Sequence, residues 1–501
     1  MKSEDGFHLI EATIDSIHGA MRSGEMTARQ LTQWYLDRIA AYDHQGPALN
    51  SIQTVNPRAL DEAERLDAEF RASGPTGPLH GIPVAVKDQV ETEDMPTTYG
   101  NALFRGFVSE RNATVVNKLK AAGAIILAKT TMGEFAQGYA GTAFGACRNA
   151  YDPTHDPSGS SSGSGVAVAA NFAVVGVGED TLGSVRGPAA RGSLVGLRPT
   201  LPLVSRFGMM PATPTRDTLG PMARTVRDAA LLLDVLAGYD PNDPVTAANV
   251  GHIPATYTSG LLADGLRGKR LGVIREPMAN DTRPDAEDYK RVRAVIDGAL
   301  RELAAGGAEI VDPVTIPSLL ELLERTGGSF ETEPAMNGYL AGFPDAPVKT
   351  LQEILLSPDV LPSRKVRLME GVGRATSDPG YLQHMLVREE LRQATYKAMA
   401  DYRLDALVYA TLDHEPGLIP DDFMTARSIP NLGNNRRLSP MIGFPALSVP
   451  AGFTSIGLPV GIELLGRPFT EGLLFTIAFA FEQATRHRRP PETTPPLPGE
   501  P

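Results

Sequence analysis

The chain has 501 residues, of which 42% are hydrophobic and 21% are charged, as in ordinary globular proteins. Its 47 basic and 59 acidic residues give a net charge of −12 without a long basic block, which argues against nucleic acid and anionic membranes as partners because both attract clusters of Lys and Arg. The single cysteine, Cys147, excludes an intramolecular disulfide.

Residues 1–74 are predicted to form helices that pack on the core. Thr27 suits the N-cap of a helix over 27–42. Apolar residues then recur at steps of three and four, which places them on one face: Leu31, Trp34, Tyr35, Ile39 and Tyr42. A break rich in Gly and Pro at 73–78 ends this segment.

From residue 75 the pattern alternates between strands and helices. Buried strands are predicted at 82–86, 124–128, 172–178, 269–274, 405–410, 443–452 and 458–466, and helices at 113–123, 225–238 and 471–485. Alternation of this kind predicts an α/β protein in which helices cover a largely buried sheet.

The chain divides into four further segments by composition. Residues 75–240 form the core that carries the motifs described below. Residues 241–435 are more helical and are predicted to be a variable cap that contributes to the substrate region. Residues 436–486 return to the core, and 487–501 contain so many prolines that we expect a disordered tail.

The run DPSGSSSGSGVA at 156–167 holds five serines and three glycines within 158–165, and three interpretations apply to it. A flexible linker is disfavoured because both flanks are apolar. A nucleophile elbow matches Gly-x-Ser-x-Gly at 159–163. The elbow requires a preceding strand, however, and Pro153 and Pro157 are incompatible with a central one.

The third interpretation depends on a second motif, GVGEDTLGSVRGPAARGSLVGLRPT, at 176–200. Its Ser184 lies 24 positions (184 − 160) after Ser160. Three further stretches accompany it: GIPVAVKD at 81–88, DTLGPMART at 217–225 and GLPVGIELLGRPFTEGLL at 457–474. Together these motifs resemble the amidase signature family, from about residue 10 to 485. The resemblance implies an α/β fold whose central mixed, twisted sheet is covered by helices on both faces.

The resemblance also implies a catalytic triad of Lys87, Ser160 and Ser184. Ser184 is then the nucleophile, and Ser160, held by a cis peptide bond to Gly159, relays its proton to Lys87. A lysine acts as a base only when neutral, and burial at a strand end lowers its pKa from about 10.4. From position alone, an ion pair between Lys87 and an acid such as Asp88 is the alternative.

The turn that carries the nucleophile has further implied roles. The resemblance places an oxyanion hole at the backbone N–H groups of Thr181, Leu182, Gly183 and Ser184, and donors arranged in this way typically stabilise a transition state by a few kcal/mol. Asp180 and Arg186 are implied to fix this turn from behind, as a structural ion pair would.

The sequence departs from the family pattern in this region. Family members usually have Gly at the position of Leu182, which we expect to be strained if the position needs a positive φ and otherwise to narrow the acyl pocket. Glu179 stands where Thr is frequent. Ser158 and Ser162 replace loop glycines, and we expect these two changes to matter little.

The stretch at 130–153 resembles the family segment that lines the acyl side of the pocket. Met132, Gly138 and Gly141 are therefore candidate substrate-pocket residues, together with backbone carbonyls near Met132–Ala136. Ordinary turn glycines are the alternative on local grounds. Met, Phe and Tyr side chains from 315–430 are expected on the leaving-group side.

We expect a hydrolase of linear amide-type C–N bonds that works through a serine acyl-enzyme, with no metal and no organic cofactor. The nine histidines match no metal motif. Related enzymes also accept aryl amides, carbamates and esters, and an apolar pocket would favour neutral, hydrophobic substrates.

Two other functions are open. One is the glutamine-hydrolysing component of a tRNA-dependent amidotransferase, which needs a partner chain, and the other is a non-catalytic binding protein. We expect a small-molecule amide as partner, with no nucleic acid and no membrane, and a homodimer is open. With neither an apolar leader nor an apolar run of membrane-spanning length, a cytoplasmic location is expected.

Overall fold

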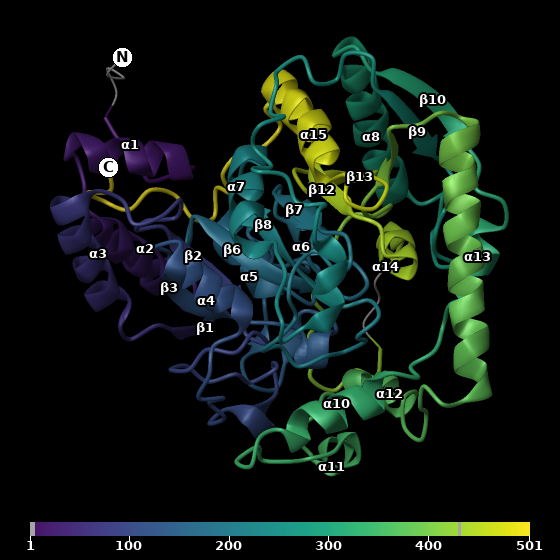
Figure 1. The fold of residues 1–501 in the computed structure, drawn as a ribbon, viewed down its shortest axis with the longest axis horizontal. Coiled ribbons are helices and arrows are strands. Elements are labelled where there is room, and N and C mark those ends of the chain that lie inside the picture. The colour runs from purple at the N-terminus through teal and green to yellow at the C-terminus, as the bar shows by residue number, and fades with distance from the viewer. Residues whose placement is uncertain (1–5, 429–431) are drawn as a thin grey trace.

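The computed structural model describes residues 6–428 and 432–501 (Figure 1). Residues 1–5 of the predicted N-terminal segment and residues 429–431 of the predicted cap lie outside the described residues. The described part is built around one large sheet, with helices packed over it (Figure 1).

The sheet has eleven strands in the described part of the chain. They are β1 (Ile52–Val55), β2 (Pro83–Lys87), β3 (Ile125–Thr130), β6 (Val175–Asp180), β7 (Val195–Arg198), β8 (Thr218–Ala223), β9 (Arg270–Ile274), β10 (Glu309–Val314), β11 (Ala406–Ala410), β12 (Ala446–Phe453) and β13 (Pro459–Leu465). Their order is β1-β3-β2-β6-β8-β7-β12-β13-β11-β9-β10. The runs β3-β2-β6 and β11-β9-β10 are parallel and the other pairs are antiparallel, so the predicted mixed sheet is confirmed.

Helices cover both faces of this sheet, as predicted. They are α1 (Ile14–Ser23), α2 (Ala28–Tyr42), α3 (Ala59–Ser73), α4 (Thr114–Ala121), α5 (Ser162–Ala169), α6 (Arg186–Arg191), α7 (Val226–Leu236), α8 (Glu287–Ala305), α9 (Leu319–Arg325), α10 (Thr332–Ala341), α11 (Leu351–Leu356), α12 (Pro362–Met369), α13 (Pro379–Asp401), α14 (Leu438–Ile442) and α15 (Glu471–Thr485). The central helices α5 and α6 pack against each other, while α4, α7, α15 and α8 pack in succession. Among the described residues, no helix combines the length and apolar character needed to cross a bilayer.

Local sequence signals account for the starts of α2 and α7. Thr27 caps α2: its side chain accepts from the N–H of Gln30, whose own side chain accepts from the N–H of Thr27, a reciprocal pattern that satisfies two free donors. Thr225 caps α7 by accepting from the N–H of Asp228. Both predicted N-caps are confirmed.

The Ser/Gly run at 158–165 is a loop as far as residue 161 and then forms the first half of α5, every residue of which is buried. A Cβ at Gly163 would meet the backbone of Ser51 and Thr131, and one at Gly165 would meet Pro188. The small residues therefore allow a helix to lie directly against its neighbours, and the flexible-linker interpretation is wrong.

The predicted cap contributes to the sheet as well as to the helices outside it. Residues 241–435 supply β9, β10 and β11, which continue the sheet from β13. Helices α10, α11 and α12 lie apart from the sheet at the foot of the view in Figure 1. The segment thus shares one body with the 75–240 core and the 436–486 return.

The predicted disorder of 487–501 is wrong. The fully buried guanidinium of Arg38 donates to the carbonyls of Thr494 and Pro495 and forms an ion pair of 2.9 Å with Glu500. A chain rich in proline cannot form a helix, but its carbonyl oxygens are free to accept hydrogen bonds. The tail is ordered because it satisfies a buried charge.

Candidate active site

Lys87 is the last residue of β2, and it is completely buried between β3 and β6. Its Nζ donates to Ser160 Oγ at 2.8 Å and to Glu179 Oε2 at 2.8 Å. Asp88, the acid considered from the sequence, accepts instead from the N–H and hydroxyl of Thr98. The ion pair of Lys87 is therefore with Glu179 and not with Asp88.

The surroundings of Lys87 act on its pKa in opposite directions. Burial lowers the pKa of Lys87, whereas the negative charge of Glu179 raises it. Asp180 and Asp217 act in the same direction as Glu179. Burial outweighs them, so the pKa of Lys87 lies below its ordinary value and the amine loses its proton more readily than an exposed lysine does.

Ser160 lies in the loop before α5, and the peptide bond from Gly159 to Ser160 is cis, as the resemblance implied. The N–H of Gly133 donates to the carbonyl of Ser160 at 3.0 Å. A Cβ at residue 159 would collide with the carbonyl of Gly138. Glycine is needed at 159 because two backbones meet there, and this contact fixes the loop.

Ser184 lies in the turn between β6 and α6 and lines the same cavity as Ser160. The N–H of Ser161 donates to the carbonyl of Ser184 at 3.3 Å, which joins the two serine loops. Among the described residues no hydrogen bond links the hydroxyls of Ser160 and Ser184. The structure thus brings Lys87 and Ser160 into direct contact and places Ser184 on their cavity.

The predicted oxyanion donors differ in what they contact. The N–H of Gly183 donates to Asp180 Oδ1 at 2.7 Å, so it is not free to bind an oxyanion, and this part of the prediction is wrong. In the described part of the chain, the N–H groups of Leu182 and Ser184 donate to no protein acceptor. Both residues and Thr181 line the cavity.

Leu182 is not strained. The positive φ of the turn, 109°, falls on Gly183, where glycine adopts it without steric cost, and Leu182 is not one of the described non-glycine residues with positive φ. Its half-buried side chain packs against the apolar cluster that includes Met441 and Phe444. The residue therefore narrows the cavity, which was the second of the two expectations.

A buried ion-pair network supports this turn from behind. Arg186 pairs with Asp180 at 3.1 Å and also with Glu463, and Arg198 pairs with Asp180 at 3.2 Å. Burial opposes ionisation of Asp180, but the two guanidinium groups outweigh it and hold its pKa below the ordinary value. Since Asp180 also holds the N–H of Gly183, the implied Asp180–Arg186 pair fixes the backbone of the turn.

A second carboxylate pair lies beneath Lys87. Thr181 Oγ1 contacts Glu179 Oε1 and, at 2.8 Å, Asp217 Oδ1. A hydroxyl has one hydrogen, so one of the two contacts needs a proton carried by a carboxyl group. Burial first, then the charge of Glu179, raises the pKa of Asp217 to about 6, so Asp217 gives up a proton less readily than an exposed aspartate does.

Sequence reasoning noted Glu179 only as a departure from the family pattern. Its contact with Lys87 arises because β2 and β6 are parallel neighbours in register, with Val86 beside Val177. The predicted strands at 82–86 and 172–178 carried the signal, and the missing information was that they are adjacent.

The cavity that contains Ser184 has a volume of about 560 Å³, within the usual range for small-molecule sites. Of the predicted pocket residues, Gly138 lines it. Met132 is fully buried and borders a separate space of about 10 Å³. Gly141 lies in the hairpin of β4 (Ala140–Gly141) and β5 (Gly145–Ala146), where a Cβ would meet Gly100. The predictions for Met132 and Gly141 are wrong, and Gly141 serves close packing.

The wall of the cavity is more polar than the sequence predicted. From 315–430, whose last two residues are outside the described part, we expected Met, Phe and Tyr. The described residues of that segment on the cavity are Glu324, Ser329, Thr332, Arg364, Arg367, Leu368 and Glu370. Arg216, Arg436 and Arg437 add further charge.

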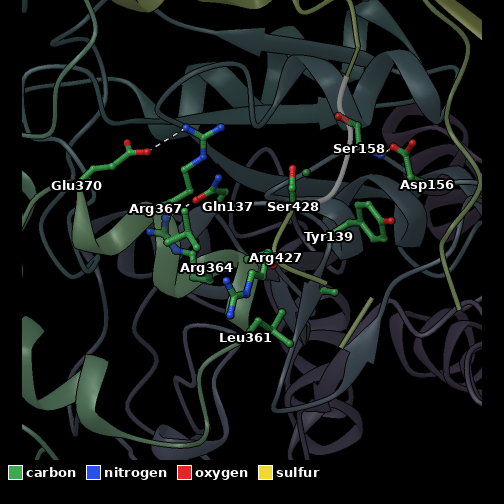
Figure 2. A pocket seen from close by; sticks show the side chains of 15 residues that line it. Gln137, Tyr139, Asp156, Ser158, Leu361, Arg364, Arg367, Glu370, Arg427 and Ser428 are labelled. Atoms are coloured by element: carbon green, nitrogen blue, oxygen red, sulfur yellow. Dashed lines mark hydrogen bonds and ion pairs between the residues drawn. The ribbon is translucent and has the colours of Figure 1, made fainter. Parts of the chain in front are cut away.

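An adjoining cavity of about 250 Å³ continues this space, since Gly138, Gly159, Arg364 and Arg367 line both (Figure 2). Within the described ranges, no group of three or more His, Cys, Asp or Glu side chains is placed to hold a metal ion. The polar side chains that line the cavity are hydroxyls, amides, guanidinium groups and carboxylates, and the buried amine of Lys87 reaches it only through Ser160.

Comparisons with known proteins agree with this geometry. A family model described as Amidase matches residues 30–475. A probable amidase of Arabidopsis thaliana is 33% identical, covering 97% of this chain and 92% of that protein. The A subunit of glutamyl-tRNA(Gln) amidotransferase from Thermosynechococcus vestitus is 35% identical, covering 96% of this chain and all of that protein.

Among solved structures, the native peptide amidase of Stenotrophomonas maltophilia superposes with a TM-score of 0.85 at 36% identity, covering 96% of this chain and 99% of that chain. The fold and the serine- and lysine-bearing site define an amidase signature enzyme. The chain belongs to the amidase family, by a match over nearly its whole length.

Proposed function

We propose that this protein is a hydrolase of linear amide C–N bonds that uses Ser184 as nucleophile and Lys87 and Ser160 as its base. The observation that carries the proposal is the fully buried Lys87, which donates to Ser160 Oγ at 2.8 Å beside the cavity that Ser184 lines. A serine hydroxyl needs such a base because it is a poor nucleophile at neutral pH.

The proposed reaction moves one proton along this path and back. Ser184 Oγ attacks the amide carbon as its proton passes to Ser160 Oγ, while the proton of Ser160 passes to neutral Lys87. The N–H groups of Leu182 and Ser184 are the oxyanion donors. When the C–N bond breaks, the relay reverses and protonates the leaving amine, and water then hydrolyses the acyl-enzyme by the same path. The contact between the two hydroxyls forms when substrate is bound, as is common for catalytic hydrogen bonds.

Glu179 has a positioning role in this scheme. Its carboxylate holds Nζ of Lys87 at 2.8 Å, next to Ser160. Its charge also opposes the effect of burial on the pKa of Lys87, so the pH at which Lys87 becomes neutral is higher than burial alone would set. Glu179 thereby sets the lower pH limit of activity.

Turnover of a panel of acyl anilides, primary amides, carbamates and esters tests the proposal. We expect hydrolysis by the wild-type chain and its loss in Ser184→Ala. Ser162→Ala is the matched control, since Ser162 is the first residue of α5, two positions after Ser160, and its Oγ has no hydrogen-bond partner within the described chain. If the wild-type chain hydrolyses none of these compounds, the proposal is refuted.

A second candidate function is glutamine hydrolysis as part of an amidotransferase. It is favoured by the similarity to the amidotransferase chain of Thermosynechococcus vestitus over the full length of that protein. That function requires a partner chain that receives ammonia. Assays of the purified chain without any partner distinguish the two functions. Hydrolysis of simple amides supports the amidase, whereas hydrolysis of glutamine but of no other amide supports the amidotransferase component.

A further inference from the structure

The catalytic cavity carries more positive than negative charge. Its lining includes five arginines and two glutamates: Arg216, Arg364, Arg367, Arg436, Arg437, Glu324 and Glu370. Two pairs neutralise one another, Arg367 with Glu370 at 3.2 Å and Arg437 with Glu324 at 2.6 Å. Figure 2 shows the first of them, with Arg364 beside it. Across residues 6–428 and 432–501, the remaining three arginines form no ion pair.

Arg216 is the least satisfied of the three. It is only 6% exposed. Its Nη2 donates to Thr213 Oγ1 at 3.0 Å and its Nη1 contacts the sulfur of Met441 at 3.7 Å, while its Nε has no partner within the described chain. Burial lowers the pKa of Arg216 to about 10, so the group is charged at neutral pH. A buried charge with unused donors is costly unless a counter-charge meets it.

The nearest carboxylates are bound elsewhere. Asp217 accepts from the backbone N–H groups of Ala212 and Thr213, besides its contact with Thr181. Glu331 accepts from the backbone N–H of Thr215 and its hydroxyl. Among the described residues neither lies within 4.0 Å of the Arg216 guanidinium, so their charges act on it only from a distance.

The other two guanidinium groups are held by the protein. Arg364 donates to the carbonyl of Phe135 at 2.6 Å and to the side chain of Gln137. Arg436 donates to Asn434 Oδ1, to Ser158 Oγ and to the carbonyl of Gly183. The Nε of Arg364 also has no partner within the described chain, but the guanidinium groups of Arg364 and Arg436 make two and three hydrogen bonds to oxygen. The guanidinium of Arg216 makes one, which leaves it the least satisfied on the cavity.

We propose that the substrate of this enzyme is an amide that carries a carboxylate group, and that Arg216 binds this carboxylate in the cavity of Ser184. The inference rests on the proposed amidase function and specifies its substrate class. An Arg–carboxylate contact supplies the missing acceptor with matching planar geometry, and its strength is greatest where water is excluded. It replaces the expectation of neutral, hydrophobic substrates.

Matched amide pairs test this inference. Glutaramate and glutaramide differ only in a carboxylate on the acyl side, and hippurate and N-(2-hydroxyethyl)benzamide differ in a carboxylate on the amine side. For at least one pair, kcat/KM of the anion should exceed that of the neutral amide by about tenfold or more, which is a small effect for a buried pair of opposite charges. That ratio should fall toward one in Arg216→Gln, chiefly through a higher KM.

Two further variants complete the test. Arg216→Lys keeps the charge without the planar fork and should give an intermediate ratio, which also covers the case in which Arg216→Gln fails to fold. Arg325→Gln is the control, because Arg325 is an exposed residue of α9 outside the cavity, and it should leave the ratio unchanged. Equal kcat/KM for both members of both pairs in the wild-type chain would overturn the inference and leave the proposed function intact.

If no amide is hydrolysed, the proposed function fails and calorimetry still tests the subsite. Glutarate should then bind the wild-type chain with an affinity that falls as salt rises, and binding should weaken at least about tenfold in Arg216→Gln. Absence of glutarate binding to the wild-type chain would overturn the inference in this case.

Discussion

Behind the two serine loops lies a group of buried charges that we call the floor of the cavity: Lys87, Glu179, Asp180 and Arg186. Each charge of the floor meets an opposite charge, whereas in the cavity wall Arg216 forms no ion pair among the described residues. Lys87 contacts Glu179 and Asp180 contacts Arg186, so the floor is satisfied before any ligand arrives. The wall, from the segments around 216, 324–370 and 434–437, keeps an unpaired guanidinium. The difference separates two tasks: groups that must be preorganised for chemistry are fixed internally, and a group that must recognise a ligand is left with free donors.

The largest effect is expected in the floor. Ser184→Ala removes the nucleophile and Lys87→Ala removes the base, and each should lower kcat by about 10³-fold or more. The double variant should be little worse than either single one, because the residues act as one unit. Single-turnover assays on a common amide measure this. Additive losses would show that the two residues act separately.

The ion pairs of the floor should matter for stability more than exposed ones. Arg186→Ala leaves Glu463 buried without its ion-pair partner and leaves Asp180 with Arg198 alone, which should cost about 3–5 kcal/mol of unfolding free energy. Arg227→Ala is the control, since its pair with Asp15 is exposed and should contribute about 0–1 kcal/mol. Urea unfolding measures both variants, and equal losses would contradict the comparison.

The C-terminal segment contains a buried ion pair outside the site, and this pair should also contribute to stability. Deletion of residues 490–501 leaves Arg38 without Glu500 and without the carbonyls of Thr494 and Pro495, so that only the carbonyls of Ala170 and Asn171 still accept from it. We expect a loss of about 3 kcal/mol in stability. The variant Glu500→Gln, which keeps the segment, should lose less. A deletion with an unchanged melting temperature would show that the tail contributes nothing.

The smallest effect is a shift in the pH profile. The kcat/KM of the amidase should rise with pH as Lys87 loses its proton. Glu179 raises the pKa of Lys87 against the lowering by burial, so Glu179→Gln should move this rise to lower pH, and Glu179→Thr should do the same. An unchanged profile, or one moved to higher pH, would mean that Glu179 does not act on the base.

The parts of the site that the sequence indicated are those carried by motifs that resemble the amidase signature family. Ser160 and Ser184 belong to two local loops, and Lys87 follows a strand recognisable from its own residues. Glu179 was visible, but its contact with Lys87 depends on which strands are adjacent. Arg216 and Arg436 reach the cavity from segments 220 residues apart in sequence (436 − 216), and no local pattern encodes that meeting.

The wrong predictions for Met132, Gly141 and the tail failed because they depend on how distant parts of the chain meet. Met132 and Gly141 are close to Gly138 in sequence, but only Gly138 reaches the cavity, because the chain turns at Phe135 and Ala136 through left-handed φ values of 47° and 63°. The tail at 487–501 was judged by its own composition. Its order depends on Arg38, more than 440 residues earlier, and composition carries no information about such a partner.

The most direct measurement is covalent capture by an activated phosphonate, followed by mass spectrometry of the labelled peptide. The account predicts that the label is on Ser184, that Ser184→Ala abolishes it, and that Lys87→Ala slows it by the same factor as hydrolysis. A label on Ser160, or labelling of Ser184 at an undiminished rate without the amine of Lys87, would contradict the proposed path of the proton.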